Sequence, residues 1–185
     1  MAHGFMYLTA IIDVYSRAIM AWGLHNSLDA ENSIEVLQLA IESHGKPEII
    51  NSDQGSQYTC PTWEKACEGI RMSMDGRRRC LDNVWIERFW RTIKREYVYI
   101  NPTDKVKELR DGIKNYIEYY NTKRPHQGIE HQNPMTNMPK SLHDEKNRKL
   151  LASSEKNDYL CSTQGKGLRL PIACCSTCGM HVSFA

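Results

Sequence analysis

Two acidic residues, Asp53 and Glu87, combine a chemically useful side chain with a position where rigid backbone is predicted. Asp53 lies in NSDQGSQYTC (51–60), soon after the strand-like run EII (48–50), so we expect it where a strand gives way to a loop. Glu87 lies in DNVWIERFWRTIKREY (82–97), whose apolar residues recur at helical spacing. The intervening segment is long enough for a helix and a strand that return Glu87 to Asp53. Carboxylate oxygens are preferred ligands of Mg²⁺ and Mn²⁺, and pairs of such ions about 4 Å apart catalyse phosphoryl transfer.

Each of these carboxylates also has an ordinary structural role open to it. An Asp at the start of a loop often accepts a hydrogen bond from the backbone two residues on, which would make Asp53 a turn residue. On a helix, Glu87 and Arg91 are one turn apart and can form a surface ion pair. The residue types alone therefore leave a metal site and a structural role both open.

A basic segment surrounds Glu87. Between positions 71 and 95 there are seven arginines and one lysine against three acidic residues, with three aromatic residues among them. Helical periodicity places Arg91 and Lys94 on the side of Glu87, while the apolar residues share another side. Basic residues near aromatic ones suit a phosphate backbone, and the alternative is a solvated helix face.

Three further arginines, Arg77, Arg78 and Arg79, lie in DGRRRC (75–80). The Asp-Gly pair and the run of charge predict a mobile loop between a strand and the helix that carries Glu87. These side chains would add to the basic surface.

The remaining pattern predicts an α/β domain with a mixed sheet and flanking helices. The first long helix carries an apolar stripe of Ile34, Leu37 and Ile41, and Pro125 follows the last helix. The expected elements are a hairpin of strands 6–12 and 18–24, a helix from Ser27 or Asp29 to Gly45, strand 48–50, a helix over 62–67, strand 70–74, and helices over 82–97 and 104–121.

Composition places the chain among ordinary globular proteins. It has 185 residues, of which 41% are hydrophobic and 25% are charged, and its net charge is +2. The apolar stretch from Phe5 ends at Asp13, too short to span a membrane, so we expect a cytoplasmic protein with no membrane partner. Seven cysteines are an odd number, and a disulfide framework is not expected.

Four ordered blocks resemble the catalytic core of bacterial insertion-sequence transposases, which are related to retroviral integrases. The blocks are YLTAIIDVYSRAIMAW, PEIINSDQGSQYT, SMDGRRRCLDNVWIERFWRTIKREY and YIEYYNTKRPHQGI. The resemblance covers roughly residues 5–140. It implies a ribonuclease-H-like fold and DNA strand transfer with Mg²⁺ or Mn²⁺ at an Asp-Asp-Glu triad. The implied partners are transposon-end and target DNA, a second copy of the chain, or intact transposase subunits.

The resemblance also implies roles for individual residues. Asp53 matches the second carboxylate of the triad and Glu87 the third. Lys94 matches a basic residue that faces DNA in this family, and Arg91 lies on the same helical face. His126, in KRPHQG, is expected to fix the loop after the last helix.

Three departures from the family limit these implications. The first catalytic Asp belongs to a central strand that precedes the hairpin in the family and has no match here, while Asp13 matches a hairpin-turn residue. Without that strand, the two inner strands are expected to lose backbone partners. The segment between Asp53 and Glu87 is about two residues shorter than usual. Residues 141–185 form an unassigned tail, in which Cys175, Cys178 and His181 offer part of a zinc site or simply reduced thiols.

Two functional hypotheses follow. In the first, the chain is a strand-transferase core that needs a further carboxylate from elsewhere. In the second, it is an inactive remnant that binds DNA or inhibits intact transposase. For this chain alone we expect no strand transfer and salt-sensitive DNA binding.

Overall fold

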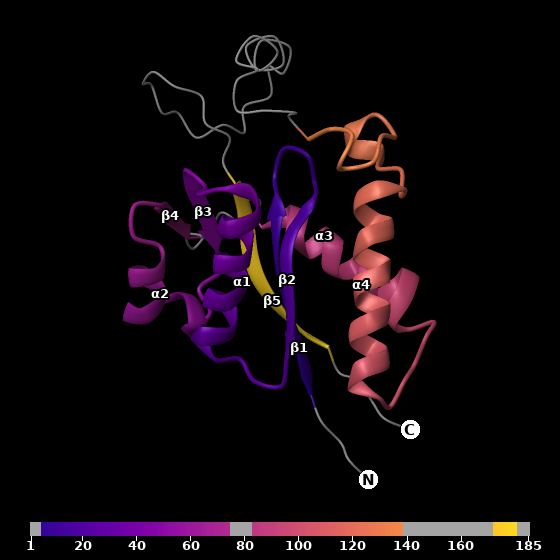
Figure 1. The fold of residues 1–185 in the computed structure, drawn as a ribbon, viewed down its shortest axis with the longest axis horizontal. Helices are drawn as coiled ribbons and strands as arrows, with labels where there is room; N and C mark the ends of the chain where they lie inside the picture. Colours follow the sequence, from indigo (N-terminus) through magenta and orange to yellow (C-terminus); the bar gives the residue numbers. More distant parts are fainter. Residues whose placement is uncertain (1–4, 75–82, 139–171, 181–185) are drawn as a thin grey trace.

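The computed structural model describes residues 5–74, 83–138 and 172–180 of the chain. These residues form three layers, in which helices cover both faces of a five-stranded sheet (Figure 1). In chain order the elements are β1 (Met6–Asp13), β2 (Ile19–His25), α1 (Ala30–His44), β3 (Ile49–Ser52), α2 (Pro61–Ala66), β4 (Arg71–Met74), α3 (Val84–Ile93), α4 (Val106–Thr122) and β5 (Ile172–Met180). The predicted order of elements is confirmed through α4.

The strand order in the sheet is β2-β1-β5-β3-β4. Strands β1 and β2 form the predicted antiparallel hairpin, and β3 and β4 are parallel. Strand β5 runs between the two pairs. It is antiparallel to β1 along the length of that strand and parallel to the end of β3, where Ser52 lies opposite Cys175.

The position of β5 differs from the sequence-based prediction. We expected a sheet without its central strand and unpaired backbone groups on β1 and β3, with residues 141–185 as an unassigned tail. Instead, the segment IACCSTCGM from that tail lies at the centre of the sheet. The physical reason is that an open slot between two strands leaves N–H and C=O groups unpaired, and a strand in the slot satisfies them. The segment contains no acidic residue.

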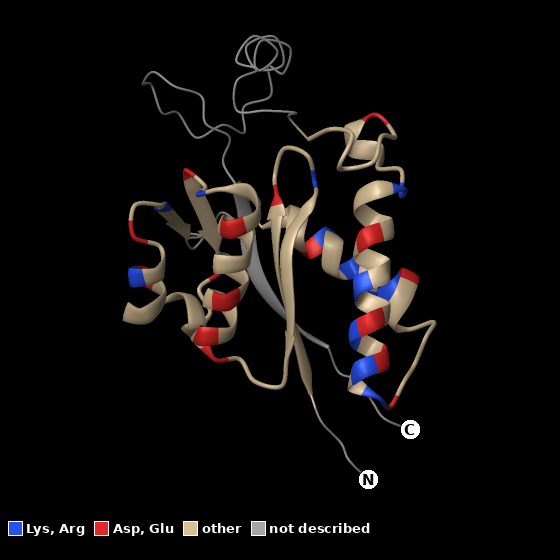
Figure 2. Ribbon diagram, viewed as in Figure 1, with Lys and Arg blue, Asp and Glu red and all other residues tan. Residues whose placement is uncertain are grey.

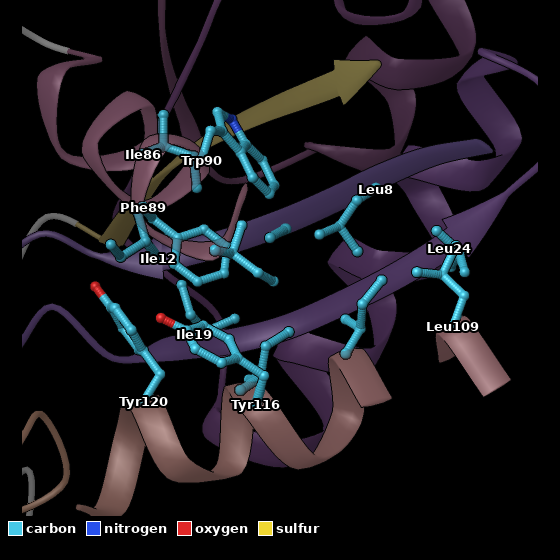
Figure 3. Packing of buried hydrophobic residues seen from close by; sticks show 14 of the residues in the cluster. Leu8, Ile12, Ile19, Leu24, Ile86, Phe89, Trp90, Leu109, Tyr116 and Tyr120 are labelled. Carbon is cyan, nitrogen blue, oxygen red and sulfur yellow. The ribbon is translucent and has the colours of Figure 1, made fainter. Parts of the chain in front are cut away.

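One face of the sheet packs against α3 and α4. Because side chains alternate along a strand, Leu8 and Ile12 of β1 join this cluster while Ile11 belongs to the cluster on the opposite face. Figure 3 shows how hairpin, α3 and α4 side chains meet, with Leu8, Ile12, Ile19, Leu24, Ile86, Phe89, Trp90, Leu109, Tyr116 and Tyr120 labelled. The predicted apolar stripes of α3 and α4 are thus buried.

The other face of the sheet packs against α1 and α2. Helix α1 begins after Asp29 and ends at Gly45, as predicted. Its stripe is centred on Leu37, which is buried together with Val36 and Ala40. The predicted Ile34 and Ile41 are only partly buried at the rim of this cluster. The stripe is therefore rotated by about one residue from the predicted one.

The end of α4 is fastened to the start of β2. The Asn121 amide donates to the carbonyl oxygen of Ile19 and accepts from its N–H, both at 2.9 Å. Nearer the other end of α4, Arg110 donates to the carbonyl oxygen of Leu24 at 2.9 Å. These bonds hold α4 along the hairpin and place the loop after α4 beside the hairpin turn.

Helices α1 and α3, which lie on opposite faces of the sheet, differ in charge (Figure 2). Helix α1 contains three glutamates and no lysine or arginine. Helix α3 and the π-helical turn that follows it, Lys94–Val98, contain four basic residues and two glutamates. Within the described residues, no helix is long and apolar enough to cross a membrane.

Candidate metal and nucleic-acid site

Asp53 follows the last residue of β3, as the sequence predicts, and is half-buried. The N–H of Gly55 donates to its Oδ1 atom at 2.9 Å. This is the Asx-turn contact that the structural interpretation anticipated. It uses one carboxylate oxygen, and within the described residues Oδ2 receives no hydrogen bond, so the turn role and a metal-binding role are compatible.

Glu87 lies in the first turn of α3 and is exposed. The ion pair with Arg91 that was the alternative for this residue is absent among the described residues, whose ion pairs are Arg71–Glu48, Lys105–Glu108 and Arg124–Glu96. The Glu87 carboxylate therefore projects from a rigid helix without a partner that neutralises it in the described part of the chain.

A hydrogen bond between β3 and the start of α3 brings the backbone around the two carboxylates together. The Asn51 amide donates to Oδ1 of the buried Asn83 at 3.1 Å. Asn51 precedes Asp53 by two residues, and the carbonyl oxygen of Asn83 accepts from the N–H of Glu87 at 3.1 Å. Along the chain, Asp53 and Glu87 are thus each only a few residues from the Asn51–Asn83 hydrogen bond. The oxygen donors fit a hard divalent cation, but in the described residues no three His, Cys, Asp or Glu side chains converge.

The predicted DNA-binding residues divide into two groups. Arg91 and Lys94 follow Glu87 by one and two helical turns, with Arg91 exposed and Lys94 half-buried. Lys94 begins the π-helical turn, a type of turn that is frequent at functional sites. Arg77, Arg78 and Arg79 lie outside the described residues.

Asp13 is a hairpin-turn residue, as expected. Its side chain is 3% exposed, and its Oδ2 atom accepts hydrogen bonds from the N–H of Ser16 at 2.9 Å and from its hydroxyl at 2.6 Å. These bonds fix the turn after β1 and occupy the Oδ2 atom of Asp13.

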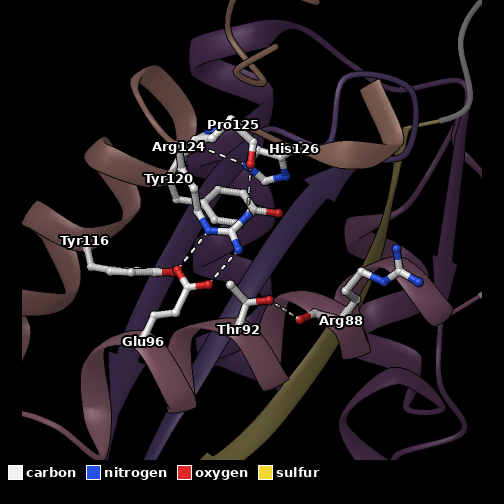
Figure 4. Close-up of polar contacts among 8 residues, drawn as sticks. All are labelled: Arg88, Thr92, Glu96, Tyr116, Tyr120, Arg124, Pro125 and His126. Carbon is white, nitrogen blue, oxygen red and sulfur yellow. Dashed lines mark hydrogen bonds and ion pairs between the residues drawn. The ribbon is translucent and has the colours of Figure 1, made fainter. Parts of the chain in front are cut away.

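The structure also gathers three arginines to which the sequence pattern alone assigns no chemical role. Arg17 of the hairpin turn, Arg88 of α3 and Arg124 after α4 line one cavity with Trp85 and His126. Figure 4 shows how α3 and the segment after α4 contribute to it. Each arginine lies in one of the four blocks named above, but residues more than 100 positions apart meet only in the folded chain.

Arg124, which lines this cavity, is held by a network of hydrogen bonds. Its Nε and Nη2 atoms donate to the two carboxylate oxygens of Glu96, at 2.8 and 2.6 Å, and the Tyr116 hydroxyl donates to the same carboxylate at 2.8 Å. The hydrogen bonds from Arg124 hold the pKa of Glu96 below its usual value. Burial is the main cause that raises the pKa of Tyr116.

His126 fixes the loop after α4, as expected. Its Nε2 atom is 3.3 Å from the carbonyl oxygen of Tyr120, and its ring meets the Tyr120 ring edge-on at 4.4 Å between centroids. Burial lowers the pKa of His126 below its usual value, so the imidazole is neutral at neutral pH. The predicted loop role is confirmed.

The layered sheet and its strand order define a ribonuclease-H-like fold, a conclusion that solved structures support. The chain is similar to the HTLV-2 integrase catalytic core domain solved with magnesium, with a TM-score of 0.55 and 20% identity over 70% of this chain and 83% of that one. It is also similar to the catalytic core domain of BIV integrase, with a TM-score of 0.56 and 16% identity over 81% and 93%. A chain of a simian T-cell lymphotropic virus intasome gives a TM-score of 0.60 at 18% identity over 72% and 49%.

Sequence comparison gives the family. The integrase core domain family matches residues 1–80 and 68–134. The transposase for insertion sequence element IS904 of Lactococcus lactis is 35% identical over 71% of this chain and 54% of its own length. A putative transposase InsK for element IS150 of Escherichia coli is 32% identical over 64% and 44%. The chain therefore belongs to the integrase core family of insertion-sequence transposases, and it spans about half the length of these relatives.

Proposed function

We propose that this chain is the part of an insertion-sequence transposase that positions metal and DNA for strand transfer, in the bacterial cytoplasm. In this proposal Asp53 and Glu87 hold Mg²⁺ or Mn²⁺. The observation that carries it is the Asn51–Asn83 hydrogen bond, because it fastens the end of β3 to the start of α3 next to both carboxylates. The family relationship supports the same assignment.

The proposed roles follow from how each side chain is held. The Gly55 N–H orients the Asp53 carboxylate through one oxygen and leaves the other for a cation. Glu87 projects from a helix whose opposite side is buried, so its backbone cannot easily move. When bound, a divalent ion activates the attacking hydroxyl group and stabilises the leaving oxygen. Arg91 and Lys94 would bind backbone phosphates along the same helical face, and the Arg77–Arg79 segment would extend that surface.

Two carboxylates are fewer than a two-metal site requires, and the β5 sequence adds none. We therefore propose that this chain alone does not catalyse strand transfer and acts with a polypeptide that supplies another carboxylate, such as an intact transposase subunit or a second copy of the chain. The alternative is a DNA-binding remnant that inhibits intact transposase. The basic side chains of α3 favour DNA binding in either case.

The test is metal-dependent cleavage and joining of labelled transposon-end DNA, with intact transposase added or omitted. We expect no product from the chain alone. With intact transposase, assistance by the chain should disappear in Asp53→Asn and Glu87→Gln but persist in Asp111→Asn, an exposed control on α4. If the chain instead lowers product formation and both substitutions leave that inhibition unchanged, the remnant hypothesis is correct and the metal role is wrong.

A further inference from the structure

A cavity of about 450 Å³ lies on the α3–α4 side of the molecule, apart from the Asp53 region. Its walls come from the hairpin turn, α3, the end of α4 and the loop after α4. The charged and aromatic side chains that line it are Arg17, Trp85, Arg88, Arg124, His126 and His131. A volume of this size is sufficient for a small ligand or for part of a polymer backbone.

Arg17 reaches this cavity from an unusual backbone conformation. Its φ angle is 69°, in the left-handed region that side chains other than glycine rarely adopt. The guanidinium carbon lies 3.3 Å from the centroid of the Trp85 ring, so the indole holds the charged group in place. Strained residues of this kind cluster at functional sites, because the surrounding structure must compensate for the strain.

Arg88 lies near the same indole. Its guanidinium carbon is 5.7 Å from the Trp85 centroid, and in the described part of the chain no carboxylate forms an ion pair with it. Two guanidinium groups thus lie near one tryptophan ring. Like charges held close together repel, and an anion between them would relieve the repulsion.

The rest of the cavity adds donors but little net charge. Arg124 is paired with Glu96, which neutralises it and fixes its position. His126 is neutral at neutral pH because burial lowers its pKa. His131, on the rim with a φ angle of 61°, adds a second imidazole. Among the described residues, the lining arginine that no carboxylate neutralises is therefore Arg88, which shares the Trp85 indole with Arg17.

We propose that this cavity binds a phosphate group, with Arg17 and Arg88 as its charged ligands and Trp85 as the surface that orders them. Guanidinium groups match phosphate oxygens with paired N–H donors. The phosphate comes either from a nucleic-acid backbone or from a free nucleotide. Arg88 and Thr92 face the cavity from a side of α3 next to the one that bears Glu87 and Arg91, so the site is separate from the proposed metal site.

The experiment measures binding to the full chain in EDTA, so that its result does not depend on the proposed metal site. The probes are deoxyadenosine 5′-monophosphate, deoxyadenosine, and a labelled 20-base-pair duplex, each titrated by calorimetry or fluorescence anisotropy. The variants are Arg88→Gln and Arg17→Gly, since glycine suits the left-handed backbone of the turn while removing the guanidinium. Arg95→Gln, exposed in the π-helical turn, is the matched control, and circular dichroism checks that each variant is folded.

We expect each cavity variant to lose about tenfold in affinity for a phosphate-bearing probe, as for a charge-assisted hydrogen bond, with Arg95→Gln close to wild type. Loss for the monophosphate but not for deoxyadenosine identifies a free-nucleotide site. Loss for the duplex alone identifies a backbone contact. If both variants bind the monophosphate and the duplex as the wild type and Arg95→Gln do, the cavity is no phosphate site.

Discussion

The carboxylate region and the arginine cavity lie on the same helix, α3, yet they are built in different ways. At the carboxylate region, Asp53 is half-buried and Glu87 is exposed, and an amide hydrogen bond between Asn51 and Asn83 joins their elements. The arginine cavity borders a buried aromatic cluster, and an ion pair with two short hydrogen bonds holds Arg124, one of the residues that line it. Residue types therefore point to the first region, whereas the second depends on tertiary structure.

The largest effect should come from breaking the strand that supports both regions. Proline has no N–H and is excluded from central strands, so Thr177→Pro in β5 should remove backbone pairing with β1, where Thr9 is its partner. We expect the free energy of unfolding to fall by roughly 3 kcal/mol. Denaturant unfolding measures this, and Thr177→Val, a strand-compatible control, should stay near wild type. Equal stability of the two variants would show that β5 does not pair in the sheet.

The next largest effect separates the two regions. Asn121→Ala removes both hydrogen bonds to Ile19 and leaves buried backbone groups unsatisfied, which should cost about 1 to 3 kcal/mol. Because Asn121 fastens the end of α4 beside the hairpin turn, phosphate binding should weaken while Mn²⁺ affinity is unchanged. Calorimetry with the phosphate-bearing probe and with Mn²⁺ measures this, and Asn101→Ala, at an exposed position, is the control. A loss of Mn²⁺ affinity as large as the loss of phosphate affinity would contradict the separation.

A smaller effect is expected for Asn83→Ala, which should weaken metal binding and leave phosphate binding unchanged. Asn83→Ala deletes the acceptor for Asn51, and we expect a loss of about 1 kcal/mol in stability. Mn²⁺ affinity should fall several-fold, because β3 and α3 are then less firmly joined, while phosphate affinity should not change. Unchanged Mn²⁺ affinity in a folded variant would mean that this hydrogen bond does not position the carboxylates.

The smallest effect concerns how the Arg124–Glu96 ion pair contributes to stability in acid. The folded pKa of Glu96 lies below its ordinary value of about 4.3, mainly through hydrogen bonds from Arg124. The stabilisation is therefore complete above that pH and is lost as the pH falls through the folded pKa. Glu96→Gln should consequently lose less stability than the wild type below about pH 4.3. Parallel pH dependences of unfolding for the two proteins would contradict this assignment.

Much of the fold can be predicted because local patterns determine it. The hairpin, α1 and the stripes of α3 and α4 follow from apolar spacing, and Gly45 and Pro125 mark where helices end. The central strand cannot be predicted in this way. IACCSTCGM lacks regular alternation, and its place depends on a slot formed by β1 and β3, which lie far away in the sequence.

The two candidate sites likewise differ in how far the sequence predicts them. Asp53 and Glu87 can be found from the sequence because strand ends and helix faces are local features. The roles of Arg17 and Arg124 cannot, because nothing in YSRA or TKRPH indicates that Trp85 and Glu96 will lie beside them. The left-handed φ of Arg17 is likewise visible only in the structure.

The most direct test of the proposed metal site is to measure Mn²⁺ affinity, with electron paramagnetic resonance detecting the free and bound ion. The variants are Asp53→Asn, Glu87→Gln and Ser176→Asp. Ser176 is chosen because it follows Cys175 in β5, and Cys175 pairs with Ser52, the residue before Asp53. We predict about a tenfold loss in each of the first two variants and tighter binding in the third, each tenfold step being about 1.4 kcal/mol. Equal Mn²⁺ affinity in the wild type, Asp53→Asn and Glu87→Gln would show that these carboxylates do not form a metal site.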